Sequence, residues 1–178
     1  HGHMNAVGYD LYCKMLSEAV KEAKGIHTME DFETTIDLNM DAFIPDSYIS
    51  NEYQKLDIYK RIAGIETQQD YDDMLEELLD RFGEMPKAVM NLLSIARLKA
   101  LAHRCYVTEI KQIGRDMKIT LYENAKLNPV GFPALMQKYR RGLQFKNEQE
   151  PKILFTPEGS GNVLTALTDL LTELEQLV

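Results

Sequence analysis

Hydrophobic residues recur every three or four positions over two neighbouring stretches in the middle of the chain, at positions 68–82 and 86–104. This spacing places them along one side of an α-helix. Gly83 follows the first stretch, where a glycine readily takes the left-handed conformation that ends a helix, and Pro86 suits the first turn of the second. The pattern therefore predicts a helical hairpin. Its two apolar stripes consist of Tyr71, Met74, Leu75, Leu78, Leu79 and Phe82, and of Val89, Leu92, Leu93, Ala96, Ala100 and Leu101.

The same period predicts further helices over positions 7–24, 50–64, 128–141 and 162–178. Side-chain oxygens suited to N-caps precede three of them, and glycine closes the first two. The residues expected to face inward are Tyr12, Met15, Leu16, Ala19, Val20 and Ala23; Leu56, Ile58, Tyr59, Ile62 and Ala63; Phe132, Leu135, Met136 and Tyr139; and Val163, Leu167, Leu170, Leu171, Leu174 and Leu177.

Elsewhere the hydrophobic period changes to two, which is typical of strands with one buried face. Ile36, Leu38 and Met40 alternate with polar residues, and the turn at 114–116 joins two such runs into a predicted β-hairpin. Helices interleaved with short antiparallel strands predict an α+β fold in a single compact domain. We expect Leu78 and Leu79 to lie in the core between the helical hairpin and the first strand. The predicted strands cover 35–40, 109–113, 117–122, 143–146 and 153–156.

Composition narrows the class of protein. The chain has 178 residues, of which 44% are hydrophobic and 27% charged, as in ordinary globular domains. No apolar run approaches the roughly 18 residues of a membrane span, so we expect no membrane association. A net charge of −8 disfavours binding to nucleic acid and suits docking onto a basic protein surface. Two isolated cysteines, Cys13 and Cys105, favour a reduced, cytoplasmic location without a disulfide.

Sequence motifs for catalysis and cofactor binding are missing. Gly159 and Gly161 are the only close glycine pair and lack the Lys and Ser/Thr of a phosphate-binding loop. His27 and His103 are too isolated for a metal site, so no cofactor is expected. Cys105, beside His103 and Arg104, is read as a buried structural residue because no catalytic partners accompany it. The basic run Lys138–Arg141 is read as a solvated helix end.

Carboxylates gather on the first helix of the hairpin, opposite its apolar stripe. We call Asp73, Glu76, Glu77 and Asp80 the carboxylate cluster. Like charges three or four residues apart cost a few tenths of a kcal/mol per pair. Only Arg81, four residues after Glu77, relieves this repulsion locally. The two interpretations are a solvated acidic face and a docking surface for arginines of another domain or partner. For the second, the interface residues would be Glu77, Asp80, Asp73, Glu76 and Arg81.

Three motif stretches resemble the C-terminal part of bacterial transcription-repair coupling factor. They occur in the family's order and at its spacing between Val7 and Arg104. One difference is Tyr9, where a phenylalanine is usual. The stretches are Val7-Gly8-Tyr9-Asp10-Leu11-Tyr12; Phe43-Ile44-Pro45 with Tyr48-Ile49 and Tyr59-Lys60-Arg61-Ile62-Ala63; and Glu77-Leu78-Leu79-Asp80-Arg81-Phe82-Gly83 with Pro86.

The resemblance implies a domain plan and a role. It makes 5–33 a helix and polar linker that follow a translocase motor, and 34–178 a C-terminal regulatory domain. Residues 1–4, by their own composition, look like a tag remnant. The family is an ATP-dependent DNA translocase that removes stalled RNA polymerase and recruits the repair protein UvrA. Its last domain is implied to mask the UvrA-binding module and restrain the motor until polymerase is engaged. This segment would then be non-catalytic, with ATP and magnesium bound only by the parent motor, and Glu77 and Asp80 would contact the UvrA-binding module.

Two other classes stay open at this level. A small hydrolase could use the carboxylate cluster, although it needs two acids whose environments push their pKa values apart. A free-standing adaptor could bind nucleic acid through Lys138–Arg141. Whether the carboxylates are exposed or line a cleft separates the first of these from a docking surface.

Overall fold

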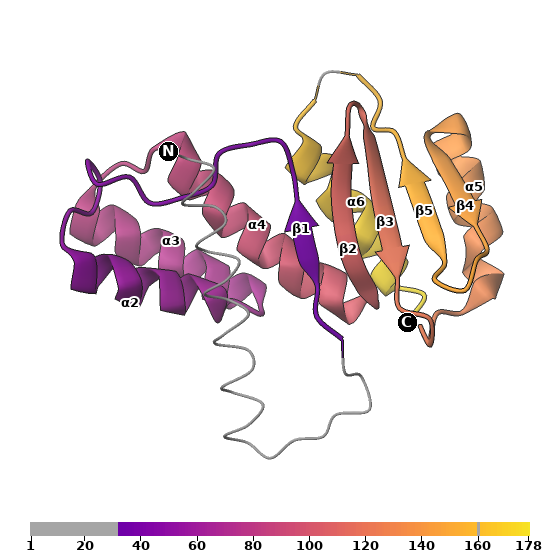
Figure 1. Cartoon of the computed structure of the whole chain (residues 1–178), viewed down its shortest axis with the longest axis horizontal. Coiled ribbons are helices and arrows are strands. Elements are labelled where there is room, and N and C mark those ends of the chain that lie inside the picture. The colour runs from indigo at the N-terminus through magenta and orange to yellow at the C-terminus, as the bar shows by residue number, and fades with distance from the viewer. Residues whose placement is uncertain (1–31, 160) are drawn as a thin grey trace, which may run out of the picture. The chain divides into compact units, whose positions relative to one another are not determined.

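The computed structural model describes residues 32–159 and 161–178 (Figure 1). Residues 1–4, the helix expected at 7–24 and nearly all of the 5–33 segment lie outside the described residues. The described chain divides into two compact units. One, the helical unit, comprises residues 40–97, and the other, the sheet unit, comprises residues 32–39 and 98–178. The elements are those of an α+β fold, so the predicted fold class is confirmed.

The helical unit is built from α2 (Glu52–Ala63), α3 (Gln68–Phe82) and the first part of α4 (Lys87–Arg104). Its helix ends follow the local signals in the sequence. The Asn51 side chain accepts a hydrogen bond from the Gln54 amide, and Thr67 forms a capping box with Asp70. Gly83 ends α3 with a φ of 84°, a backbone conformation that residues with a Cβ atom rarely adopt. The predicted hairpin and its turn are confirmed.

The core of the helical unit is one apolar cluster with Leu78 at 0% exposure. Two of the inward-facing assignments were wrong: Leu56 is 52% exposed and Leu79 is 46% exposed. Both lie at the edge of their apolar stripe, where the turn of about 100° per residue carries a side chain toward solvent. The buried members of the cluster are Ala42, Ile44, Ile49, Ile58, Ile62, Ile65, Met74, Leu78, Met85, Val89, Leu92, Leu93 and Ala96.

The sheet unit contains a five-stranded sheet in the order β1-β2-β3-β5-β4. The predicted β-hairpin is present as β2 and β3, and β3, β5 and β4 pair antiparallel. β1 pairs parallel to β2, with Ile36 opposite Ile110, so the expectation of antiparallel strands alone was wrong. The first strand also ends at Asp37, short of Met40. The strands are β1 (Thr35–Asp37), β2 (Val107–Ile113), β3 (Asp116–Leu121), β4 (Leu143–Lys146) and β5 (Lys152–Phe155).

Helices α5 (Phe132–Tyr139) and α6 (Val163–Glu175) belong to the same unit, and Figure 1 shows α6 behind the sheet. The alternation predicted for β3 is confirmed, since Met117, Ile119 and Leu121 are all buried. The opposite face of the sheet carries exposed polar residues such as Lys111 and Lys146. α6 buries Leu164, Leu167, Leu170, Leu171 and Leu174.

Phe32 corrects the interpretation of the end of the 5–33 segment as a polar linker. Its ring is buried and lies 4.5 Å from the His103 ring and 4.8 Å from the Tyr122 ring, between centroids. The end of that segment is therefore fixed to the sheet unit by aromatic packing.

Among the described helices, none combines the length and the hydrophobicity that crossing a lipid bilayer requires.

Candidate functional site: a protein-interaction surface on α3

The carboxylate cluster lies on α3, and the structure divides it into two parts. Asp73, Glu76 and Asp80 are exposed, and we call them the outer acidic row. Their spacing of three and four residues puts them on one stripe of the helix. Glu77 follows Glu76 and is turned by about 100° from it, toward α2. The five residues predicted as an interface therefore do not all face the same way.

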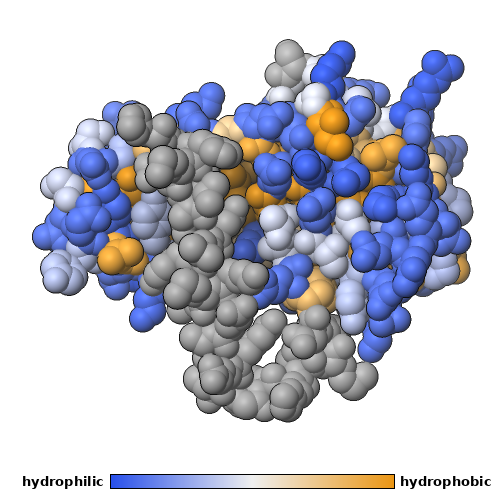
Figure 2. Space-filling view, viewed as in Figure 1, coloured by the Kyte–Doolittle hydropathy of each residue, from blue (hydrophilic) through white to orange (hydrophobic). Residues whose placement is uncertain are grey.

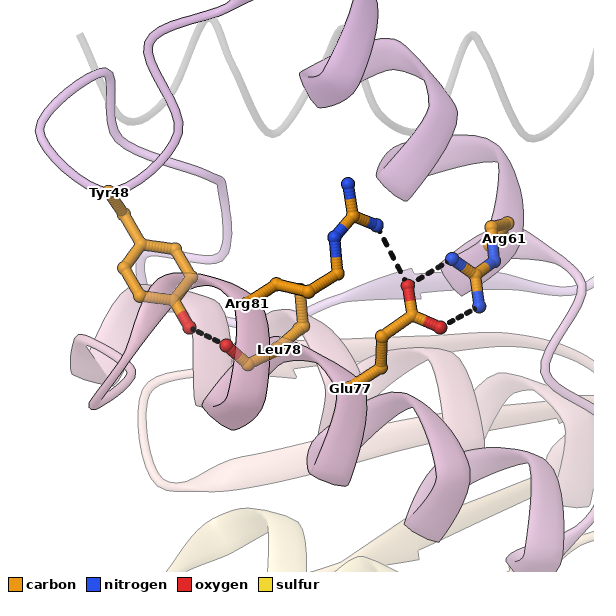
Figure 3. Close-up of polar contacts among 5 residues, drawn as sticks. All are labelled: Tyr48, Arg61, Glu77, Leu78 and Arg81. Carbon is orange, nitrogen blue, oxygen red and sulfur yellow. Dashed lines mark hydrogen bonds and ion pairs between the residues drawn. The ribbon is translucent and has the colours of Figure 1, made fainter.

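Glu77 is engaged within the chain. The two terminal nitrogens of the Arg61 guanidinium, on α2, each donate to one of the two Glu77 carboxylate oxygens (Figure 3). Arg81 Nη1 donates to Glu77 Oε2 at 2.9 Å. We call Arg61, Glu77 and Arg81 the Glu77 ion-pair cluster. It joins α2 to α3 beside their shared apolar core, and its Arg61 member was missed by the sequence analysis.

The two arginines change the acidity of Glu77. The hydrogen bonds from Arg61, together with the single hydrogen bond from Arg81 and the charges of both arginines, lower the pKa of the Glu77 carboxyl from 4.5 to about 2. Partial burial acts in the opposite direction and is outweighed. Arg61 is affected in the complementary sense, since its hydrogen bond to Glu77 raises the pKa of its guanidinium. The carboxylate is therefore ionised throughout the physiological range.

This shift predicts how acid affects stability. The Glu77 pKa is lower in the folded state, so its contribution is present above pH 4.5 and is lost as the pH falls toward 2. Because the side chain is 29% exposed, solvent screens the pairs, and we expect roughly 1–2 kcal/mol. Glu77→Gln should lower the unfolding free energy by that amount at pH 6 and have little effect near pH 2. Urea denaturation across this range checks it; a pH-independent difference would contradict it.

The outer acidic row has a different environment. Asp73 Oδ1 accepts a hydrogen bond of 2.7 Å from Gln69 Nε2, one turn earlier. Glu76 and Asp80 make no hydrogen bond or ion pair with any residue of the described part of the chain. Two like-charged pairs, Asp73 with Glu76 and Glu76 with Asp80, thus remain uncompensated on the surface. The visible surface over α2 and α3 is mostly hydrophilic, with hydrophobic colour confined to small patches (Figure 2).

Contacts among the motif residues account for their spacing in the sequence. The Tyr48 hydroxyl lies 3.1 Å from the Leu78 carbonyl oxygen and 2.9 Å from that of Gly83, at the end of α3. The Tyr59 hydroxyl accepts a hydrogen bond of 2.9 Å from the Ile44 amide. The Tyr48 contacts and the Arg61–Glu77 pair connect the second motif stretch to the third, and the Tyr59–Ile44 bond joins two parts of the second. Much of that pattern therefore specifies the fold of the helical unit.

The geometry gives little support to a hydrolase. A carboxyl acting as general acid needs a raised pKa, whereas Glu77 is held ionised by two arginines. The other three carboxylates lie on a convex, exposed helix face. In the described residues, no three His, Cys, Asp or Glu side chains are grouped closely enough to hold a metal ion. The arrangement is an exposed acidic helix face, which fits either a solvated surface or a docking surface.

Three of the other candidate residues, Cys105, His103 and Lys138, make contacts within the described part of the chain. Cys105 is fully buried, its thiol donates to the Leu171 carbonyl at 3.3 Å, and burial raises its pKa to about 12. This confirms the interpretation as a structural cysteine. His103 Nδ1 lies 3.2 Å from Thr34 Oγ1. In the basic run, Lys138 forms an ion pair with Glu173 on α6, while Arg140 and Arg141 are exposed.

Comparison with known proteins identifies the family. The model of the family described as the TRCF domain matches residues 38–132, more than half of the chain. The chain belongs to the TRCF domain family. This match contains the motif stretches that begin at Phe43 and at Glu77, so the resemblance to transcription-repair coupling factor is confirmed there. The stretch at 7–12 lies outside the match and outside the described residues.

Individual relatives agree with this assignment. A transcription-repair-coupling factor of Bacillus subtilis (strain 168) is 41% identical over 126 residues, which is 70% of this chain and 11% of the relative. That of Staphylococcus aureus (strain USA300) is 42% identical over 130 residues, 72% of this chain and again 11% of the relative. The chain thus spans about a tenth of the length of the curated relatives it matches.

The fold has a counterpart among solved structures. The crystal structure of a C-terminal domain of transcription-repair coupling factor superposes with a TM-score of 0.69 and 24% sequence identity. The alignment covers 81% of this chain and 95% of that one. At this identity the similarity establishes a common fold.

Proposed function

We propose that this chain is the regulatory domain of a transcription-repair coupling factor. In the resting protein it masks the UvrA-binding module and restrains the ATP-dependent DNA translocase until stalled RNA polymerase is engaged. The domain itself is non-catalytic, and its direct partners are the UvrA-binding module and the motor. UvrA and RNA polymerase act on it indirectly.

The observation that carries the proposal is the outer acidic row. Asp73, Glu76 and Asp80 repel one another on α3 without a cationic partner in the described chain, and they lie within the span that matches the family model. Arginines on a facing module would relieve this repulsion. The masked and released states then differ in free energy by a few kcal/mol. A third partner that binds one of them more tightly can shift the equilibrium between them.

The experiment uses the chain in trans. The Bacillus subtilis relative is prepared without the residues that match this chain, and its ATP hydrolysis and UvrA binding are measured as this chain is added. Both activities should fall as the chain binds. The variant Glu76→Arg with Asp80→Arg should lose this effect, because the reversal puts like charges together at the interface. Failure of the wild-type chain to bind or to lower either activity would refute the proposal.

A matched control is available in the sheet unit. Glu123→Arg with Glu158→Arg makes the same change in net charge at two exposed positions distant in sequence from α3. This variant should inhibit as well as the wild type. Equal loss of inhibition in both double variants would indicate an effect of net charge rather than of the outer acidic row.

A further inference from the structure

The Glu77 carboxylate is largely occupied before any partner arrives. A carboxylate offers about four acceptor positions on its two oxygens. Arg61 takes one on each oxygen with its two terminal nitrogens, and Arg81 takes a third, on Oε2 (Figure 3). A partner arginine that approached Glu77 with the paired geometry preferred for carboxylates would need both oxygens.

The two resident arginines differ in how they are held. Arg81 makes one hydrogen bond to Glu77, and its guanidinium also lies 4.9 Å from the centre of the Phe82 ring, to which it is attracted as a cation. Arg61 uses both of its terminal nitrogens on Glu77, and its side chain is 41% exposed. Arg61 therefore blocks a partner arginine from binding both Glu77 oxygens. Its exposed side chain can also leave Glu77 and be replaced by a partner that arrives from solvent.

Arg61 also has an alternative partner on its own helix. Asp57 lies four residues earlier on α2, is exposed, and already favours the charged form of Arg61 through its own charge. An acid four residues before a base is the favourable order for a pair on one helix. An Arg61 side chain that left Glu77 would thus keep a carboxylate within reach.

We propose that Arg61 sets the affinity of the docking surface by exchanging between Glu77 in the free chain and Asp57 in the docked chain. A partner arginine takes the place of Arg61 on Glu77 as the surface docks. This inference rests on the proposed function, because it assumes that the α3 surface meets a basic partner. It adds that Glu77 joins the contact only after an internal ion pair opens.

The first test measures binding to the Bacillus subtilis relative that lacks its matching residues. Arg61→Gln should bind roughly fivefold more tightly than Lys60→Gln, since an exposed pair of this kind contributes about 1 kcal/mol. Lys60→Gln removes the same charge from the neighbouring exposed position and so corrects for the change in net charge. Equal affinities of the two variants would overturn the exchange.

A second variant leaves the resting ion pair intact. Asp57→Asn removes only the alternative partner, so it should weaken binding roughly threefold relative to Glu123→Gln, which makes the same charge change at an exposed position of the sheet unit. Binding as tight as in that control would contradict the role of Asp57. Thermal melts of every variant separate these effects from unfolding.

A third measurement needs no protein partner. The chain, with ¹³C-labelled carboxyl groups, is titrated with a hexa-arginine peptide while the Glu77 resonance is followed by NMR. In Arg61→Gln the resonance should respond at a roughly fivefold lower peptide concentration than in Lys60→Gln. Equal midpoints overturn the inference even if the relative binds. A lower midpoint without any binding to the relative supports the exchange at Glu77 and refutes the proposed function.

Discussion

Replacing Leu78 with alanine should lower the unfolding free energy of the helical unit by about 2–5 kcal/mol, the usual range for a buried leucine. The side chain has 0% exposure and belongs to the apolar cluster formed by α2, α3, α4 and the segment before α2. Removing three carbons there takes away apolar contacts and leaves a cavity that a close-packed surrounding fills only in part. The loss can be measured from native-state hydrogen exchange of the α3 amides.

Leu79 is the matched control for this change. It is the next residue of the same helix and has the same side chain, but it is 46% exposed. Leu79→Ala removes less buried surface and opens no enclosed cavity, so the expected loss is below about 1 kcal/mol. Similar losses in the two variants would mean that the orientation of α3 differs from the one described.

These neighbours illustrate which parts of the fold the sequence predicts. Helix ends depend on one or two residues near the end itself, and Gly83 was correctly predicted to end α3. The alternation in β3 likewise identified its buried face. Such features are local, because the backbone groups that need partners and the residues that supply them are close in sequence.

Features that join distant segments were predicted less well. The width of the buried stripe on α3 depends on where α2 and α4 pack. The period of hydrophobic residues carries no such information, and it wrongly placed Leu79 inside the stripe. The parallel pairing of Ile36 with Ile110 joins positions 74 residues apart (110 − 36). The alternation of hydrophobic residues does not indicate whether two such strands pair parallel or antiparallel. Phe32 is buried by rings of His103 and Tyr122, which lie far along the chain.

The candidate site shows the same division between local and distant information. Spacing on one helix found the carboxylates and the Glu77–Arg81 pair, which are three or four residues apart. Arg61 is 16 residues from Glu77 and reaches it from another helix. The only sequence signal was that both residues lie in the motif stretches that resemble the family. Those stretches do not indicate that Arg61 and Glu77 bind each other.

The Arg61–Glu77 pair changes what charge reversal on α3 should do. In the sequence pattern, Glu77 and Asp80 both lie opposite the apolar stripe, so the pattern alone predicts that reversing their charges leaves the fold intact. In the structure, Glu77 is the anion between two guanidinium groups, whereas Asp80 is exposed without a partner in the described chain. The two positions should therefore respond very differently to the same substitution.

Glu77→Arg should lower the unfolding free energy by roughly 2–3 kcal/mol, because it removes the partner of Arg61 and Arg81 and places a third cation beside them at a half-buried position. Asp80→Arg should change it by less than about 0.5 kcal/mol, or raise it slightly, because it removes a negative charge near the negative end of the helix. Urea denaturation at neutral pH in low salt measures both. Added salt should reduce the Glu77→Arg deficit by screening the repulsion among the three cations. If Glu77→Arg were as stable as Asp80→Arg, the ion-pair cluster would contribute nothing to the packing of α2 on α3, and the carboxylate would be as free to meet a partner as those of the outer acidic row.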